Sequence, residues 1–151
     1  MSFNITANSG TGFDITLGSA PENYTSGFFA TLPTDNADLT NPITPADVLT
    51  DDNTFATETG GLFVIHQFKY TNDNNTDNIV PTWKGKSDIA TSDSTMFLQI
   101  YNYITPGWET LDTDTATALD TEFTLTGTQS TNLSDYYSTN QVSIRVYQAY
   151  A

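Results

Sequence analysis

The sequence predicts an all-β fold, either a sandwich or a barrel of short antiparallel strands. Threonine is the commonest residue, and with valine, isoleucine, phenylalanine and tyrosine it supplies the β-branched and aromatic side chains that pack well on pleated sheets. Several segments alternate between two faces, and polar turns separate them at short intervals. Long runs of helix-forming residues are missing. With 151 residues, the chain is long enough for one domain with a continuous core.

The strand pattern recurs along most of the chain. We expect strands at residues 3–7, 13–17, 28–32, 61–70, 78–85, 95–104, 107–113, 121–128 and 141–150. One helical turn is expected in NLSDYYS, residues 132–138. Pro81 falls inside an expected strand, and because proline cannot donate a ladder hydrogen bond, that strand is predicted to lie at a sheet edge or to contain a bulge.

The stretch STMFLQIYNYITPGWETLDTDT, residues 94–115, predicts a β-hairpin. Pro106 and Gly107 stand where a type II turn prefers these residue types, between two strand-like runs. The first run alternates strictly, which predicts that one set of apolar side chains faces an opposite sheet, namely Leu98, Ile100 and Ile104. The other face carries Tyr101 and Tyr103, and we expect the N-terminal segment or a partner to cover it.

The first third of the chain differs in amino-acid composition from the rest. Residues 18–53 hold four of the six prolines, which fix the backbone and interrupt ladders. This composition favours an extended arm that packs on its own domain or reaches a neighbouring subunit. The expected organisation is therefore N-terminal strands and an arm over residues 1–50, followed by a sandwich core over residues 51–151.

The charge balance restricts the classes of partner. Four basic residues stand against 18 acidic ones, giving a formal net charge of −14. Binding to nucleic acid is not expected, because no basic stripe exists to neutralise phosphates. The acidity favours solubility, cation binding or docking onto a basic protein surface. We also expect no signal peptide and no membrane span, so that the protein would be made in the cytoplasm.

Enzymatic chemistry is not predicted. There is no cysteine, and His66 is the only histidine. His66 alternates with apolar residues in an expected strand, which favours a hydrogen-bonded sheet residue over a catalytic base. Carboxylates sufficient for a two-acid glycosidase are present, but no spacing favours one pair, and an acidic chain produces such pairs by chance.

Two tryptophans and two lysines are candidate interaction residues. Trp83 and Trp108 each follow a proline-bearing segment, and we expect burial between sheets, with an exposed stacking platform for a sugar as the alternative. Lys84 and Lys86 flank Gly85 and form the one basic spot. They are interpreted either as an exposed turn or as a contact with an acidic neighbour in another subunit.

Four tyrosines complete the candidate interaction residues. Tyr136 and Tyr137 end the predicted helical turn, so one ring is expected to plug the open end of the sandwich while the other faces solvent or a partner. Tyr101 and Tyr103 are the alternative stacking surface for a sugar.

From about residue 51 onward, the chain resembles the galactose-binding-like jelly-roll sandwiches. The resemblance is carried, in order, by the segments DDNTFAT, HQFKY, PTWKGKS, FLQIYNYITPGWETLD, TEFTLTG, LSDYY and VSIRVYQ. It implies a jelly-roll-like antiparallel β-sandwich, and similar domains occur in virion proteins of tailed phages, at head decoration or fibre positions. These motifs are structural rather than catalytic.

The same resemblance implies a structural calcium. The loop LTDDNTFATETG would supply hard oxygen ligands from Asp51, Asp52, Asn53 and the carbonyl of Thr57. The alternative is a solvated acidic turn, because the spacing of an EF-hand is missing.

Two functions follow as expectations. The first is a non-enzymatic virion structural protein, most simply a capsid decoration or cement subunit. It would form homo-oligomers and contact the major capsid protein or other virion proteins. The second is a carbohydrate-binding module of a fibre or adhesin, which requires an exposed aromatic surface beside polar groups.

Overall fold

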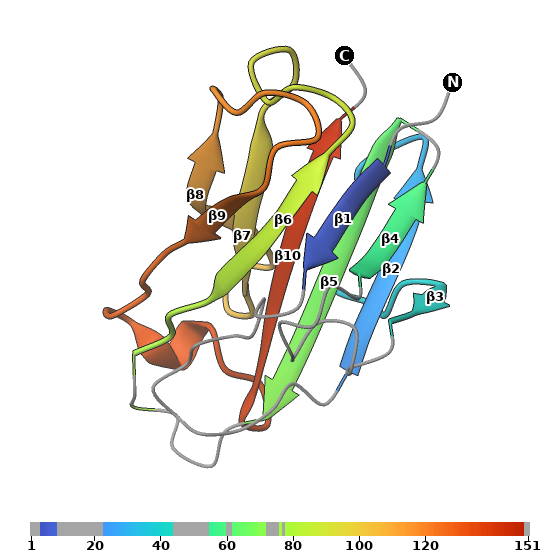
Figure 1. The fold of residues 1–151 in the computed structure, drawn as a ribbon. Helices are drawn as coiled ribbons and strands as arrows, with labels where there is room; N and C mark the ends of the chain where they lie inside the picture. The colour runs from blue at the N-terminus through green and yellow to red at the C-terminus, as the bar shows by residue number, and fades with distance from the viewer. Residues whose placement is uncertain are drawn as a thin grey trace.

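Two antiparallel sheets lie face to face in the computed structural model, which describes residues 4–8, 23–43, 55–59, 62–71, 76 and 78–149 (Figure 1). One sheet has four strands in the order β4-β1-β6-β9, and the other has six in the order β3-β2-β5-β10-β7-β8. The strands are β1 (Asn4–Asn8), β2 (Asn23–Phe29), β3 (Asn41–Pro42), β4 (Phe55–Thr59), β5 (Phe63–Thr71), β6 (Thr82–Ser87), β7 (Met96–Asn102), β8 (Gly107–Asp114), β9 (Phe123–Thr126) and β10 (Gln141–Ala149). The predicted all-β sandwich is confirmed.

The chain crosses from one sheet to the other at most of its connections. Among the described strands, β2–β3 and β7–β8 are the only consecutive strands that pair with each other. This exchange between two layers gives the sandwich its jelly-roll-like character. In the described part of the chain the single helical element is the 3-10 helix η1 (Leu133–Asp135), within the predicted helical turn. No described helix is long and apolar enough to cross a membrane.

Most strands lie where alternation predicted them, and the differences come from pairing partners. β2 begins at residue 23 rather than 28, because it pairs with β5 along its whole length and Tyr24 packs edge-on against Phe68, with ring centroids 5.5 Å apart. The short β3 and β4 were not predicted. The strand expected at 13–17 lies outside the described residues.

The expectation for Pro81 is wrong. β6 lies between β1 and β9 and is therefore an interior strand of its sheet. Pro81 directly precedes the first ladder residue, so its missing N–H costs the sheet nothing. Its carbonyl oxygen accepts hydrogen bonds from the Gly127 amide and the Thr126 hydroxyl, each at 3.2 Å.

The hairpin of β7 and β8 is confirmed, but its turn differs from the predicted one. Gly107 already pairs with Asn102 as the first residue of β8, and its φ lies outside the left-handed range that a type II turn requires there. The Asn102 side chain closes the turn instead. Its Oδ1 accepts the amides of Ile104 and Thr105, both at 2.9 Å.

The core lies between the sheets and contains the alternating apolar residues of the long strands. Leu98 and Ile100 face the four-stranded sheet as predicted and are fully buried. Ile104 is 69% exposed, contrary to expectation, because it belongs to the turn rather than to β7. In β6 the buried positions alternate strictly, which places Trp83 in the core.

Candidate functional site

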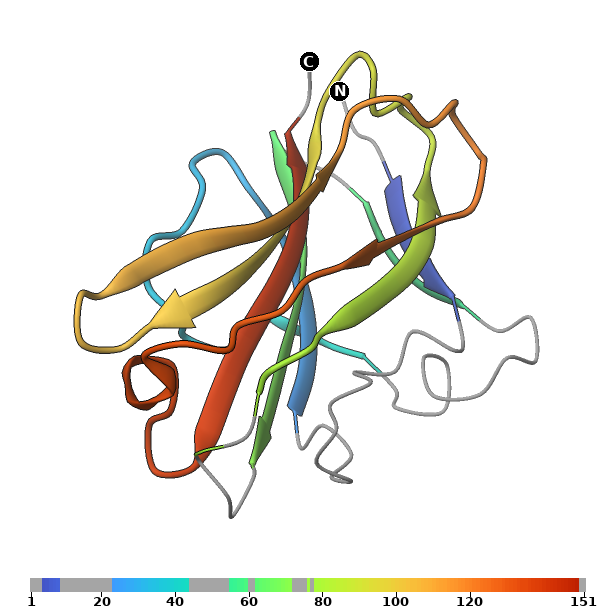
Figure 2. The same ribbon diagram turned by 90° about the vertical axis from the view of Figure 1, so that its left-hand side faces the viewer.

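Residues 31–40, here called the strap, follow β2 and cross the outer face of the six-stranded sheet. Figure 2 shows this segment on the side of that sheet opposite to β1, β6 and β9. Gln67 of β5 donates from Nε2 to the carbonyl oxygens of Asn36 and Ala37, at 3.2 and 2.9 Å. Lys69 forms an ion pair with Asp38 at 2.7 Å. The strap is therefore fixed to the sheet by polar contacts.

The middle of the strap is also held by strands that follow later in the chain. The indole Nε1 of Trp108 donates to the carbonyl oxygen of Asp35 at 2.9 Å. Asn36 donates from Nδ2 to the Tyr103 hydroxyl and to Ser143 Oγ, both at 3.2 Å. As expected, the tyrosine-bearing face of the β7–β8 hairpin is covered by the N-terminal segment.

Under the strap, polar side chains form one row across the sheet. The pairing register aligns, strand by strand, Thr25, Gln67, Arg145, Gln99 and Thr110. Alternation produces this row, because residues in register share one face of a sheet. Gln99 donates from Nε2 to Thr110 Oγ1 at 3.0 Å and accepts from Arg145 Nε at 2.8 Å. The row thus places a guanidinium at its centre.

Arg145 is a buried cation without a carboxylate partner in the described part of the chain. The residue is 3% exposed, and its Nη1 donates to the carbonyl oxygen of Pro33 at 2.7 Å. Its guanidinium carbon lies 4.4 Å from the ring centroid of Trp108 and 5.2 Å from that of Tyr147. Burial lowers the pKa of Arg145 to about 10, so the side chain stays charged at neutral pH.

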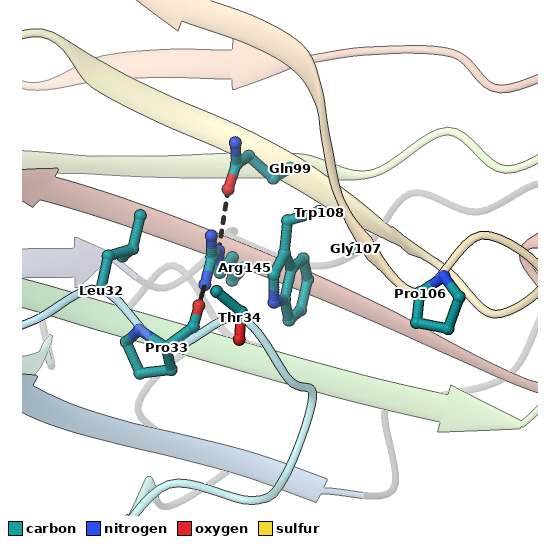
Figure 3. A pocket seen from close by; sticks show the side chains of 8 residues that line it. All are labelled: Leu32, Pro33, Thr34, Gln99, Pro106, Gly107, Trp108 and Arg145. Atoms are coloured by element: carbon teal, nitrogen blue, oxygen red, sulfur yellow. Dashed lines mark hydrogen bonds between the residues drawn. The ribbon is translucent and has the colours of Figure 1, made fainter.

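A pocket of about 330 Å³ opens between the strap and the hairpin, with Arg145 and Gln99 in its lining (Figure 3). The lining residues are Leu32, Pro33, Thr34, Gln99, Pro106, Gly107, Trp108 and Arg145. One wall is the strap and the other is the start of β8 with the indole ring. Apolar walls with a few polar groups are the usual composition of a small-molecule site.

The two tryptophans have different environments. Trp83 is buried between the sheets, which confirms the prediction. Trp108 is only half-buried and lies on the outer face of the six-stranded sheet, so the prediction of burial between sheets is wrong for it. Tyr101 is buried with its ring edge-on to those of Tyr103 and Trp108, with centroids 5.2 Å away in both cases. It therefore supports Trp108 and offers no exposed stacking surface.

The tyrosine pair after η1 also differs from expectation, because both rings are buried in the core. Tyr136 donates its hydroxyl to Glu109 Oε2 at 2.6 Å and thereby joins the segment after η1 to β8. Burial, with this carboxylate beside the hydroxyl, raises the pKa of Tyr136 to about 12. Neither Tyr136 nor Tyr137 faces solvent.

Lys84 and Lys86 are not in a turn, since both belong to β6. They project from the partly exposed side of the strand, while Gly85 between them is buried. Lys84 forms an ion pair with Glu122 of its own chain at 2.9 Å. The alternation of β6 explains why two lysines two residues apart share one face.

His66 is fully buried, and among the residues that the structure describes neither of its ring nitrogens has a hydrogen-bond partner. The prediction of a hydrogen-bonded sheet residue is therefore wrong. Its ring lies 6.3 Å from that of Phe68 and 6.4 Å from that of Trp83, measured between centroids. Burial lowers the pKa of His66 to about 3, so the imidazole is neutral at physiological pH.

Three of the proposed calcium ligands, Asp51, Asp52 and Asn53, lie outside the described residues. Thr57 belongs to β4, where it pairs with Thr6 of β1. Among the residues that the structure does describe, no group of three or more His, Cys, Asp or Glu side chains could hold a metal ion.

Sequence reasoning missed Arg145 and Gln99 as site residues, although one signal was present. Arg145 is the only arginine and stands in the middle of an apolar alternating strand, VSIRVYQ. Because Ile144 and Val146 face the core, Arg145 had to lie on the opposite face of β10. The strap residues that complete the pocket gave no local signal.

Comparison with known proteins places the chain in a family. Residues 21–151 match the family model AF_1625_C, described as "Uncharacterized protein, C-terminal domain". No curated protein and no solved structure matches the chain. The matched range contains every strand from β2 to β10, including all the pocket residues. Because the match covers most of its length, the chain belongs to the AF_1625_C family of C-terminal domains.

Proposed function

We propose that this protein is a non-enzymatic binding domain that holds a small carbohydrate in the pocket beside Trp108. The observation that carries the proposal is the composition of this pocket, which combines an indole ring with hydrogen-bonding groups of Arg145 and Gln99. A volume of about 330 Å³ lies at the lower end of the range for small-molecule sites. It suits a ligand of one or two sugar rings.

The chemistry of a sugar matches this lining. Its ring presents C–H groups that pack against an aromatic face, and its hydroxyl groups both donate and accept hydrogen bonds. Thr34 and Gln99 offer donor and acceptor atoms, whereas Arg145 only donates. Since the strap is already fixed by the hydrogen bonds of Asn36 and Asp35, little ordering entropy would be lost on binding.

Screening on a glycan array, followed by calorimetric titration of any hit, tests this proposal. We expect Trp108→Ala to weaken binding by at least about tenfold, since truncating a central aromatic contact costs more than 1 kcal/mol. Phe28→Ala is the matched control, because it removes a half-exposed aromatic ring outside the pocket. A folded protein that binds no glycan, or equal losses in both variants, would contradict the carbohydrate function.

A virion structural role is the second candidate, and a specific surface feature favours it. Phe28 and Leu62 are 52% and 50% exposed. The backbone segments that carry them are neighbours, because the Leu62 amide donates to the carbonyl oxygen of Phe29, next to Phe28, at 2.9 Å. Adjacent exposed apolar side chains favour a protein contact, either with a second copy of this chain or with another virion protein such as the major capsid protein.

Light scattering of the purified protein tests the self-association part of this role. The wild type is expected to be an oligomer, and the double variant Phe28→Ser/Leu62→Ser is expected to dissociate. Ile104→Ser/Leu119→Ser is the matched control, because it removes two other exposed apolar side chains. A monomeric wild type would argue against homo-oligomerisation.

A further inference from the structure

We propose that the ligand of the pocket carries a carboxylate that pairs with Arg145, as a hexuronate residue of a glycan does. This inference rests on the proposed function, in which the pocket between the strap and the hairpin binds a sugar. It adds the chemical class of that sugar, and the argument comes from the charge and the fixed position of the guanidinium.

The charge of Arg145 is incompletely compensated within the described structure. A buried cation is normally paired with an anion, because removing a charge from water is costly. The described ion pairs join Lys69 to Asp38 and Lys84 to Glu122, and neither involves Arg145. The chain has 18 acidic residues, yet the pocket lining contains none of them.

The donors of the guanidinium are also only partly used. Arginine carries five N–H bonds, and those to Gln99 Oε1 and the Pro33 carbonyl are the hydrogen bonds that Arg145 forms with the described residues. Figure 3 shows the guanidinium held between Gln99 and Pro33, beside the indole of Trp108. The remaining donors belong to a side chain that lines the pocket.

The contacts of Arg145 fix the orientation of the guanidinium before any ligand arrives. Gln99 and Pro33 hold two of its nitrogens, and the Trp108 ring lies 4.4 Å from its central carbon. A fixed planar fork of this kind suits a carboxylate, which can accept two parallel hydrogen bonds. Preorganisation also lowers the entropic cost of binding.

The net charge of −14 predicts how such a ligand would reach the site. The acidic surface repels an anion at long range, but salt screens this repulsion beyond roughly 8 Å at physiological ionic strength. Inside the pocket, attraction to the nearby Arg145 guanidinium outweighs this long-range repulsion. Association of a uronate should therefore become faster as salt is raised from low concentration, whereas association of a neutral sugar should not change.

Calorimetric titration of the wild-type protein with matched sugars tests the inference directly. The probes are glucuronate, galacturonate, their neutral parents glucose and galactose, and glucuronamide, which keeps the shape of glucuronate without its charge. We expect at least one uronate to bind about tenfold or more tightly than its neutral parent and its amide, since a hydrogen bond to a charged group is worth more than a neutral one.

A side-chain signal gives a second readout that needs no substitution. Arg145 is the only arginine, so the protein has a single arginine Nε–H resonance in an NMR spectrum. A bound uronate should shift this resonance, and glucuronamide at the same concentration should not. Arg145→Met should abolish the preference for uronates. Lys84→Met, which removes a cation from the other sheet, should leave the preference unchanged.

The outcomes separate this inference from the function on which it rests. Equal binding of uronates and neutral sugars, or an unshifted Arg145 resonance during uronate binding, would overturn the inference and leave the carbohydrate function standing. Binding of no sugar at all would overturn both. If Arg145→Met fails to fold, the comparison of glucuronate with glucuronamide on the wild-type protein still tests whether the pocket prefers a carboxylate.

Discussion

Replacing His66 by leucine is expected to stabilise the protein at pH 7 by about 1 to 3 kcal/mol, the cost of leaving a buried polar group without a partner. His66 is fully buried between the sheets, and neither ring nitrogen has a hydrogen-bond partner in the described part of the chain. Leucine has a similar volume and no polar atom, so it should fit against Phe68 and Trp83 with little rearrangement. Urea denaturation of both proteins measures the difference.

The stabilisation should grow as the pH falls. The folded-state pKa of His66 is lowered to about 3 by burial, whereas its unfolded-state value is near 6.5. Between these values the unfolded chain binds a proton that the folded chain does not. Protonation therefore favours unfolding, and stability is lost as the pH falls below about 6.5. His66→Leu does not lose stability in this way. The difference in free energy of unfolding between the variant and the wild type should therefore increase by about 1.4 kcal/mol per pH unit between pH 6 and pH 4.

Titration of the many carboxylates also changes stability in this pH range. Because the wild type and His66→Leu share these carboxylates, the difference between their unfolding free energies reports the contribution of His66. His66→Gln is the matched control, because it keeps a buried polar group but does not titrate. It should remove the pH dependence assigned to His66 without the gain at pH 7. Parallel stability curves for the wild type and His66→Leu would show that the imidazole accepts a proton in the folded state.

Trp83→Ala is expected to lower the free energy of unfolding by about 3 to 5 kcal/mol, the usual cost of deleting a buried aromatic ring. Trp83 is 1% exposed, and β6 directs it into the core. Its ring packs edge-on against Phe123, with centroids 5.6 Å apart, and lies beside His66. The cavity would open at the centre of the sandwich, where the sheets cannot collapse easily.

Trp83→Phe separates the contribution that the packing of this ring makes to stability from the contribution of its indole N–H. The indole Nε1 of Trp83 is buried and has no hydrogen-bond partner among the described residues, so phenylalanine loses part of the volume but also removes an unsatisfied donor. We expect a cost well below that of alanine, measured by urea denaturation at pH 7. Equal costs for the two variants would mean that a hydrogen bond of the indole, rather than its packing, stabilises the core.

The sequence alone predicts the fold class and most of the strands, because alternation and turn residues are local signals. β7, β8 and β10 lie within two residues of their predicted bounds. It also placed Trp83 in the core and joined β7 to β8 in a hairpin. The predictions from sequence are wrong where a local pattern is compatible with two structures. Ile104 continues the alternation of β7 but lies in the turn, where the Asn102 side chain ends the strand.

The position of the pocket could not be predicted from the sequence, because its two walls come from distant parts of the chain. Arg145 and the Pro33 carbonyl to which it donates are 112 residues apart. Alternation showed which residues share a face of one strand, but not which strands become neighbours. The register of β10 between β5 and β7 brings Arg145 beside Gln99, and the strap crosses the same row. Such pairings are set by the packing of the whole sandwich rather than by any local segment.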